Sequence, residues 1–403
     1  MLGQAVKVPI PRRGVDYRGK IVLAPMVRSG ELPSRLLALS YGADLVWGPE
    51  TVDLSMIGTT RRFNEESKTI EWSRPTSHGQ IDSIIYKMCP ARESGKLIFQ
   101  IGTSDPERAV QAARLVAADV AGIDVNAGCP KPFSTSGGMG AALLKTPDKL
   151  CAILEALVSD ITPEYEIGIS VKIRILETAA ETEVLIRRLC ATGITGLTVH
   201  CRTTPMRPRQ RAIRDQLRMV AQVCHEYGVA CLMNGDVENR DQGVALAEEY
   251  GADGAMIATA AEKNPTCFRP EAEGLLPWRD VVCHYVKMAM GVHNRFANTK
   301  FLLSHIIPGK EHMSQQVSKV KTYSQICTLL QLDHLAEQAA DVDAAMGLDQ
   351  AYVKPSKRGK SNPSALAAGG HMERTRPRKA LSERTVVEQA PQEKQESVSL
   401  AAT

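Results

Sequence analysis

The chain has 403 residues, of which 43% are hydrophobic and 23% are charged, and its net charge at pH 7 is +4. This composition excludes a disordered or fibrous chain, and no apolar run reaches the ~18 residues that a membrane-spanning helix needs. The first twenty residues lack the apolar core of a secretory signal, and the 10 cysteines show no paired metal spacing. We therefore expect an intracellular protein with no membrane association, no metal site and no disulfide framework.

Eight short β-rich segments follow one another through the first two thirds of the chain. They span residues 21–26, 45–50, 97–102, 122–128, 169–174, 196–200, 230–236 and 254–258. Helical patterns lie between most of them: one follows the capping box Ser104-Asp-Pro-Glu107, and another opens at Thr146-Pro147-Asp148. Strands that are apolar on both faces and alternate with helices form a parallel sheet. Eight such strands favour an α/β fold of the TIM (β/α)8 barrel type over an open doubly wound sheet.

Two further regions interrupt or follow the barrel pattern. Residues 51–96 are long for a barrel loop, which predicts an extra hairpin or an active-site cover. From Trp278 to Met346 the strand pattern stops and helical spacing replaces it. We therefore expect a barrel domain over residues 15–275, a small all-α helical domain over 276–350 and a disordered basic tail over 351–403.

The basic excess of the chain lies in this tail. Residues 351–380 carry a local charge of +7 and residues 381–403 one of −2, which leaves −1 for the first 350 residues. A Ser/Pro/Gly-rich segment of this kind cannot bury a core. It is either only a solvated end, or an electrostatic tether for nucleic acid or a nuclear signal. The expected location is the cytoplasm, with the nucleus as the alternative that the tail leaves open.

The C-terminal strand ends of a (β/α)8 barrel carry its active site, so the polar residues there are informative. In chain order they are Pro25-Met26, Glu50, Gln100, Asn126, Lys172 with Arg174, His200 with Arg202, Asn234-Gly235-Asp236 and Ala258-Thr259-Ala260. Gln100, Lys172 and His200 offer donors and positive charge to an anionic heterocycle. The glycines and backbone N–H groups of the last two strands suit a phosphate. Taken singly, each residue also fits a structural role; together they predict a flavin mononucleotide (FMN) site.

A single thiol is presented in the predicted mouth by the segment Asn126-Ala-Gly-Cys-Pro-Lys131, which Gly137-Gly-Met-Gly140 follows. Glycines and prolines give this loop an unusual course. A loop cysteine taken alone is more often inert than catalytic. The loop therefore marks Cys129 as a candidate without assigning its role.

Several motifs together resemble the tRNA-dihydrouridine synthases. They are Leu23-Ala-Pro-Met-Val-Arg28, Gly128-Cys-Pro-Lys131, Gly137-Gly-Met-Gly-Ala-Ala-Leu143, Val171-Lys-Ile-Arg174, Val199-His-Cys-Arg202 and Asn234-Gly235. The stretch Arg28-Ser-Gly-Glu-Leu-Pro-Ser-Arg-Leu-Leu-Ala-Leu39, with Tyr41-Gly-Ala-Asp44, is similar to the eukaryotic type-2 members in particular. The resemblance runs from about residue 19 to 275 and continues more weakly through the helical domain.

The resemblance implies a flavoenzyme that uses NADPH and FMN to reduce the C5–C6 double bond of uridine 20 in the tRNA D-loop. Hydride then reaches C6 from the flavin, and Cys129 corresponds to the general acid that protonates C5. A thiol suits this role because it is mostly protonated at neutral pH. The positions that correspond to flavin contacts are Pro25, Met26, Val27, Gln100, Lys172, His200, Asn234, Gly235, Asp236, Ala258 and Thr259. Arg174 and Arg202 correspond to basic positions near the substrate.

Two departures from the family pattern carry expectations of their own. The family usually has Arg at the position of Thr259, which predicts weaker flavin binding. The chain after Asp349 is too short for the double-stranded-RNA-binding domain of animal members, as in a fungal-like form. Binding of tRNA then falls to basic residues of the helical domain, namely Arg295, Lys300, Lys319 and Lys321. Among these, Lys300 is the first candidate because Asn298-Thr-Lys-Phe301 resembles a family motif.

Two other functions stay open at this point. One is a flavin barrel that acts on a free pyrimidine, similar to a dihydroorotate or dihydropyrimidine dehydrogenase. The other is a non-catalytic RNA chaperone on a degenerate barrel, which the residue Thr259 favours. The motifs favour the tRNA enzyme, and we expect it to act as a monomer without an obligate protein partner.

Overall fold

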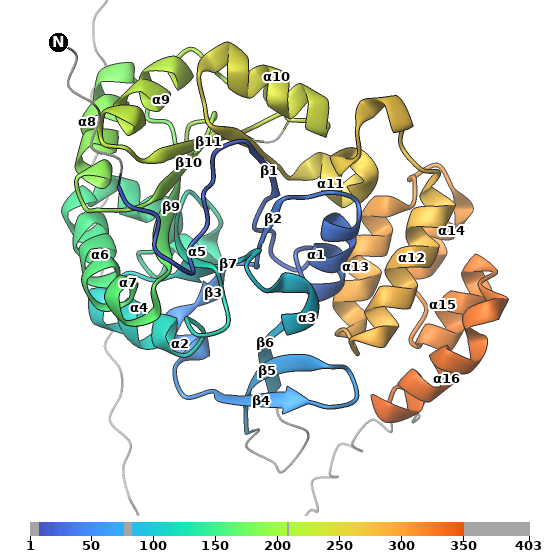
Figure 1. Ribbon diagram of the computed structural model, residues 1–403. Coiled ribbons are helices and arrows are strands. Elements are labelled where there is room, and N and C mark those ends of the chain that lie inside the picture. The colour runs from blue at the N-terminus through green and yellow to red at the C-terminus, as the bar shows by residue number, and fades with distance from the viewer. Residues whose placement is uncertain (1–7, 76–82, 208, 350–403) are drawn as a thin grey trace, which may run out of the picture. The chain divides into compact units, whose positions relative to one another are not determined.

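The computed structural model describes residues 8–75, 83–207 and 209–349. The predictions for the tail over 351–403 lie outside these residues. A closed parallel barrel forms the first part of the chain (Figure 1). Its strands are β1 (Lys20–Leu23), β2 (Leu45–Trp47) with its continuation β3 (Thr51–Val52), β7 (Leu97–Gly102), β8 (Gly122–Ala127), β9 (Gly168–Arg174), β10 (Gly196–His200), β11 (Ala230–Asn234) and β12 (Gly254–Ile257). Pairing of β1 with β12 closes the ring, which confirms the predicted TIM barrel.

Helices surround this ring (Figure 1). The longer ones are α1 (Leu32–Ser40), α4 (Pro106–Arg114), α6 (Pro147–Asp160), α8 (Ala179–Cys190), α9 (Leu217–Glu226) and α10 (Arg240–Tyr250). Shorter ones are α2 (Asp53–Met56), α3 (Pro90–Glu93), α5 (Pro132–Thr135), α7 (Thr162–Tyr165) and α11 (Thr259–Lys263), with 3-10 turns at Gly140–Lys145, Pro265–Phe268 and Glu271–Glu273.

Local sequence fixes where several helices begin. The Asp105 side chain accepts a hydrogen bond from the Arg108 N–H, at 2.9 Å, and Pro106 takes the first helical position of α4. The prediction that Ser104 caps this helix was therefore wrong by one residue, because a proline belongs directly after the capping residue. In α8, Thr178 and Glu181 form a reciprocal capping box.

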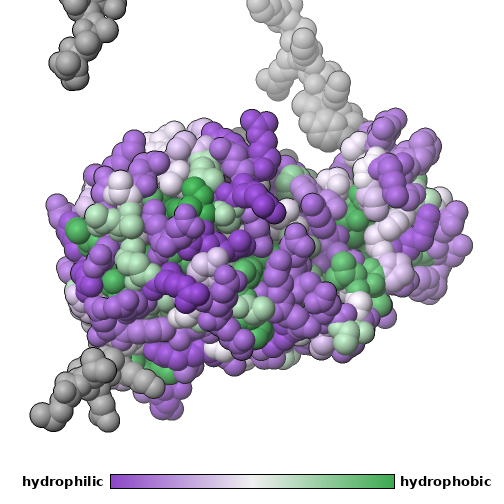
Figure 2. Space-filling model, turned by 90° about the horizontal axis from the view of Figure 1, so that it is seen from above, coloured by the Kyte–Doolittle hydropathy of each residue, from purple (hydrophilic) through white to green (hydrophobic). Residues whose placement is uncertain are grey.

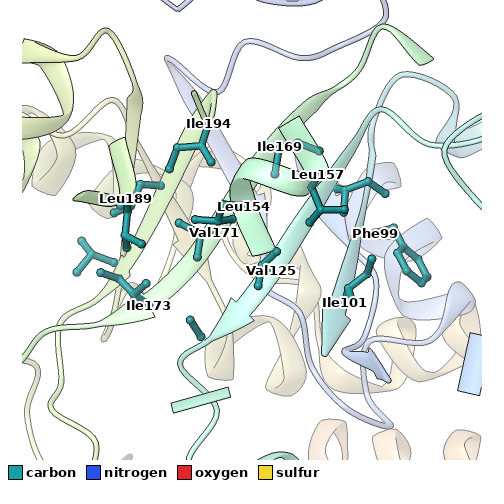
Figure 3. Close-up of a cluster of buried hydrophobic side chains, with 14 of the residues drawn as sticks. Phe99, Ile101, Val125, Leu154, Leu157, Ile169, Val171, Ile173, Leu189 and Ile194 are labelled. Carbon is teal, nitrogen blue, oxygen red and sulfur yellow. The ribbon is translucent and has the colours of Figure 1, made fainter. Parts of the chain in front are cut away.

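The main core lies between the strands and the outer helices. Figure 3 shows Leu154 and Leu157 of α6 lying over Val125, Ile169 and Val171 of the neighbouring strands. A second buried cluster includes Val22, Trp47 and Ile98, whose side chains alternate with those that face the helices. Burial on both faces explains why these strands are continuous apolar runs.

An antiparallel sheet takes up the long segment after β3. It consists of β4 (Thr60–Asn64), β5 (Thr69–Arg74) and β6 (Ser83–Met88), so the predicted extra hairpin is confirmed. A buried ion pair joins this segment to α1: Arg35 Nε lies 2.6 Å from Glu93 Oε1. The Arg35 guanidinium also donates to the backbone oxygen of Gly30, which follows β1.

The last described part is helical. It contains α12 (Trp278–Gly291), α13 (Phe296–Ile306), α14 (His312–Val317), α15 (Tyr323–Leu330), a 3-10 turn (Asp333–Leu335) and α16 (Ala336–Ala345). These helices share a core of their own, to which Leu37 of α1 contributes. The domain limits at 275 and 350 stay predictions. Within the described ranges no helix is long and apolar enough to span a membrane, and the face in Figure 2 is mostly hydrophilic.

Candidate active site

Two cavities at the C-terminal strand ends bring together most of the predicted site residues. The first has a volume of about 390 Å³ and is lined by Pro25, Met26, Val27, Gln100, Cys129, Lys172, Arg174, His200, Asn234 and Ala258. The second, of about 500 Å³, shares His200, Asn234 and Ala258 and adds Arg202, Gly235, Asp236 and Thr259. Lys300 lines neither cavity.

The loop after β8 holds the Cys129 thiol at the first cavity. Asn126 Oδ1 accepts the N–H groups of Gly128, at 3.0 Å, and Cys129, at 3.1 Å. The loop then folds back, so that the Ala141 N–H donates to the Cys129 oxygen, at 2.9 Å. Burial raises the pKa of the Cys129 thiol, and the nearby Glu50 carboxyl raises it further. The thiol therefore keeps its proton at neutral pH.

Glu50 lies in the break between β2 and β3 and lines the same cavity. Its Oε1 accepts the Ser134 hydroxyl, at 2.8 Å, whereas its Oε2 is buried with no hydrogen-bond partner in the described structure. Burial raises the pKa of this carboxyl. Its position at a strand end was visible in the sequence, but no sequence pattern connects it with Cys129.

Lys172 and Asn234 form a fixed pair across β9 and β11. Lys172 Nζ donates to Asn234 Oδ1, at 3.0 Å, and Asn234 Nδ2 donates to the Met256 oxygen, at 2.9 Å. Burial and, after it, the Arg174 charge lower the pKa of Lys172 to about 8. The ammonium is thus charged at pH 7 but poorly solvated, which favours a nearby anion.

Gln100 is oriented by a buried carboxylate. Its Nε2 donates to Asp124 Oδ2, at 2.8 Å, and the Ser170 hydroxyl donates to the other oxygen, at 2.7 Å. Burial raises the pKa of Asp124 to about 6. These bonds hold the amide so that its oxygen and second N–H are available to a ligand in the cavity.

His200 is neutral, and its tautomer follows from its neighbour. Arg202 Nη1 lies 3.2 Å from His200 Nε2, and because a guanidinium only donates, Nε2 accepts and Nδ1 carries the proton. Burial, Lys172, Arg174 and Arg202 together lower the pKa of His200 to about 2. His200 therefore offers hydrogen bonding and no charge. The same Arg202 donates to Asp236 Oδ1, at 2.5 Å.

The remaining predicted substrate contacts have structural partners. Arg174 Nε donates to the Gly128 oxygen, at 2.8 Å, and its Nη1 to the Thr203 oxygen, at 2.9 Å, so it joins two loops of the mouth. Lys300 Nζ donates to the backbone oxygens of Ser318, at 3.1 Å, and Val320, at 2.9 Å. The tRNA contact assigned to Lys300 stays a prediction, and its ammonium is occupied within the helical part.

Helix α13 adds two aromatic side chains that the sequence analysis missed. Phe301 and His305 line the first cavity, with ring centroids 4.6 Å apart. The Arg28 guanidinium lies 4.1 Å from the Phe301 ring centroid. The sequence contained a signal for Phe301, since it directly follows Lys300 in the motif Asn298-Thr-Lys-Phe301. Among the described residues, no group of three or more His, Cys, Asp or Glu is placed to hold a metal ion.

A parallel barrel whose strand ends gather cations, amides and one protonated thiol defines a (β/α)8-barrel enzyme with a site for an anionic ligand. The dihydrouridine synthase (Dus) family model matches residues 22–345, and the chain belongs to this family.

Named relatives agree with this assignment. The tRNA-dihydrouridine(20) synthase [NAD(P)+] of Schizosaccharomyces pombe is 44% identical over 344 residues, which cover 84% of this chain and 70% of that protein. The protein of the same name from Saccharomyces cerevisiae is 43% identical over 325 residues, covering 78% and 84%. The tRNA-dihydrouridine(20a/20b) synthase [NAD(P)+] of Saccharomyces cerevisiae is 28% identical and covers 64% of each chain.

Proposed function

We propose that this protein reduces the C5–C6 double bond of uridine 20 in the tRNA D-loop to 5,6-dihydrouridine, with NADPH as reductant and FMN as cofactor. The observation that carries the proposal is the protonated Cys129 thiol in the same cavity as the Lys172 ammonium and the fixed amides of Gln100 and Asn234. The names of the relatives in two yeasts support the choice of tRNA and of position 20.

The donor set of the two cavities fits a flavin mononucleotide. Lys172, Gln100 and Asn234 suit the electron-rich edge of the ring, and His200 adds a donor at Nδ1. In the second cavity the Thr259 hydroxyl and the Lys263 ammonium suit a phosphate. When bound, this cofactor supplies a hydride, taken from NADPH, to C6 of the uracil ring.

The chain's own residues account for the proton. Cys129 donates its Sγ proton to C5 of the uracil, which leaves a thiolate that solvent reprotonates. Lys172 and Arg174 lie close enough to Cys129 for their charges to act on it, and they favour the thiolate as it forms. A loop uridine can turn outward into the mouth with little loss of stacking.

The test is the dihydrouridine content of unmodified tRNA after incubation with purified protein, FMN and NADPH, mapped by position with mass spectrometry. Product at position 20 that is strongly reduced by Cys129→Ala supports the proposal. A yellow, NADPH-oxidising protein that forms no product would indicate a small-molecule reductase. A colourless protein that binds tRNA without product would indicate an RNA chaperone.

A further inference from the structure

The segment that follows β10, residues 201–214, is rich in arginine and is called the arginine loop below. It contains Arg202, Arg207, Arg209, Arg211 and Arg214 and no Asp or Glu. It starts beside His200, at the cavities of the candidate site.

The first and last arginines hold the loop against the barrel. Arg202 Nε donates to the Gln210 oxygen, at 2.7 Å, besides its bond to Asp236. Arg214 Nη2 donates to the backbone oxygens of Gly235, at 2.9 Å, and Asp236, at 3.1 Å. The Ala212 N–H donates to Asp236 Oδ2, at 2.7 Å. The ends of the loop are therefore fixed to the β11 rim.

The three middle arginines do not hold the loop against the barrel. Arg207, Arg209 and Arg211 are exposed, and within the described ranges none of their guanidinium groups forms an ion pair or a hydrogen bond. Some exposed arginines elsewhere in the fold are paired with acids, as in Arg61 with Asp119, at 2.8 Å. The fold itself thus makes no use of these three side chains.

The charges near the arginine loop also favour an anionic partner. The positive charges of Arg202 and Arg207 help burial to lower the pKa of Arg174, so the arginine loop adds positive charge beside a buried cation of the mouth. Cations that follow one another closely in the chain and have no acidic partner are stabilised by an anion. Because the three free guanidinium groups lie on an exposed rim outside the cavities, an extended polyanion fits them better than a single small phosphate.

We propose that Arg207, Arg209 and Arg211 bind backbone phosphates of the RNA that carries the target uridine. This inference rests on the proposed function and adds the surface that holds the substrate. Guanidinium groups bind phosphate oxygens in a bidentate way, and such contacts position a nucleic acid without reading its bases. The arginine loop then fixes the strand while the base enters the first cavity.

The test compares binding of an unmodified tRNA transcript to the full chain and to the variant Arg207→Gln/Arg209→Gln/Arg211→Gln. Each phosphate contact contributes roughly 0.7–0.9 to the slope of log Kd against log salt. The variant is expected to lower this slope by about 2 to 3 and to weaken binding at 0.1 M salt about tenfold or more. Melting temperatures check that the variant is folded.

A matched control removes three positive charges at the opposite end of the barrel. Lys20 begins β1, Lys96 directly precedes β7, and Arg114 ends α4. The variant Lys20→Gln/Lys96→Gln/Arg114→Gln should keep the slope of the unmodified protein. If both triple variants show the same slope of log Kd against log salt, the arginine-loop proposal is wrong. The proposed function would still stand in that case, provided that the wild-type protein binds tRNA and forms dihydrouridine. Absence of tRNA binding and product in the wild type would instead overturn the proposed function.

Discussion

Replacing Lys172 by methionine should stabilise the ligand-free protein at neutral pH. Burial lowers the pKa of this lysine from 10.5 to about 8. At roughly 1.4 kcal/mol for each pKa unit, keeping the ammonium charged in the fold costs about 3 kcal/mol at pH 7. Methionine fills a similar space without the charge. Loss of the hydrogen bond to Asn234 offsets about 1 kcal/mol of the gain, so the net stabilisation is about 2 kcal/mol.

The sign of this effect depends on pH. Since the pKa of Lys172 is lower in the folded than in the unfolded state, the penalty is full below pH 8 and disappears as the pH rises toward 10.5. The advantage of the methionine variant should shrink by about 2 kcal/mol between pH 7 and pH 9.5. Urea unfolding of both flavin-free proteins at these two pH values measures it, with the exposed Lys149→Met as control. A destabilised variant at pH 7, or an equal difference at both pH values, would refute the reasoning.

Three further changes probe the mouth and its support. Glu50→Gln should lower the pKa of the Cys129 thiol, which the carboxyl raises; the pH midpoint of Cys129 alkylation by iodoacetamide, followed by peptide mass spectrometry, measures it. Gly140→Ala should reduce dihydrouridine formation roughly tenfold or more, because a Cβ would lie 2.6 Å from the Cys129 oxygen and displace the loop. Arg35→Ala should lower the free energy of unfolding by about 3–5 kcal/mol, since it leaves Glu93 buried without its partner.

Each of these changes has a control or an outcome that would contradict it. Gly95→Ala matches Gly140→Ala: its φ of 69° is similarly positive, but nothing lies within 4 Å of its Cβ. Equal activity losses in both would mean that backbone strain alone is responsible. An unchanged pH midpoint of Cys129 alkylation in Glu50→Gln would show that the carboxyl does not raise the pKa of the thiol. The double variant Arg35→Met/Glu93→Gln should recover part of the stability, and a loss as large as that of Arg35→Ala contradicts the buried-pair account.

The barrel was predictable because its strands are buried on both faces. Successive residues of each strand are therefore apolar, and the strands appear in the sequence as short apolar runs. Each of the eight predicted segments overlaps a strand. The second run was predicted as one strand over 45–50, but it is interrupted after Trp47 and resumes at Thr51. The sequence does mark this break, because Pro49 has no N–H to donate to the strand ladder. Tertiary packing requires the glycine beside it: Tyr86 of β6 lies so close to Gly48 that a Cβ there would clash with it.

The site was predictable as a set of strand-end residues but not as a set of contacts. Gln100 lies beside Asp124 and His200 beside Asn234 because of the register between neighbouring strands. Register is a property of the pairing and cannot be read from one strand alone. The bond between Arg202 and His200 depends on the course of the loop after β10, which no local pattern fixes.

Two cations of the mouth, Lys172 and Arg174, are buried at an energetic cost, although Glu50 and Glu262 line the same cavity. Lys172 and Arg174 each have a pKa lowered first by burial and then by a neighbouring cation. Arg174 donates only to backbone oxygens in the contacts described above, so no carboxylate neutralises it directly. A fold selected for stability alone would replace such groups with apolar side chains. An anionic ligand that pairs with these cations would offset this cost, so its binding is expected to raise the stability of the protein.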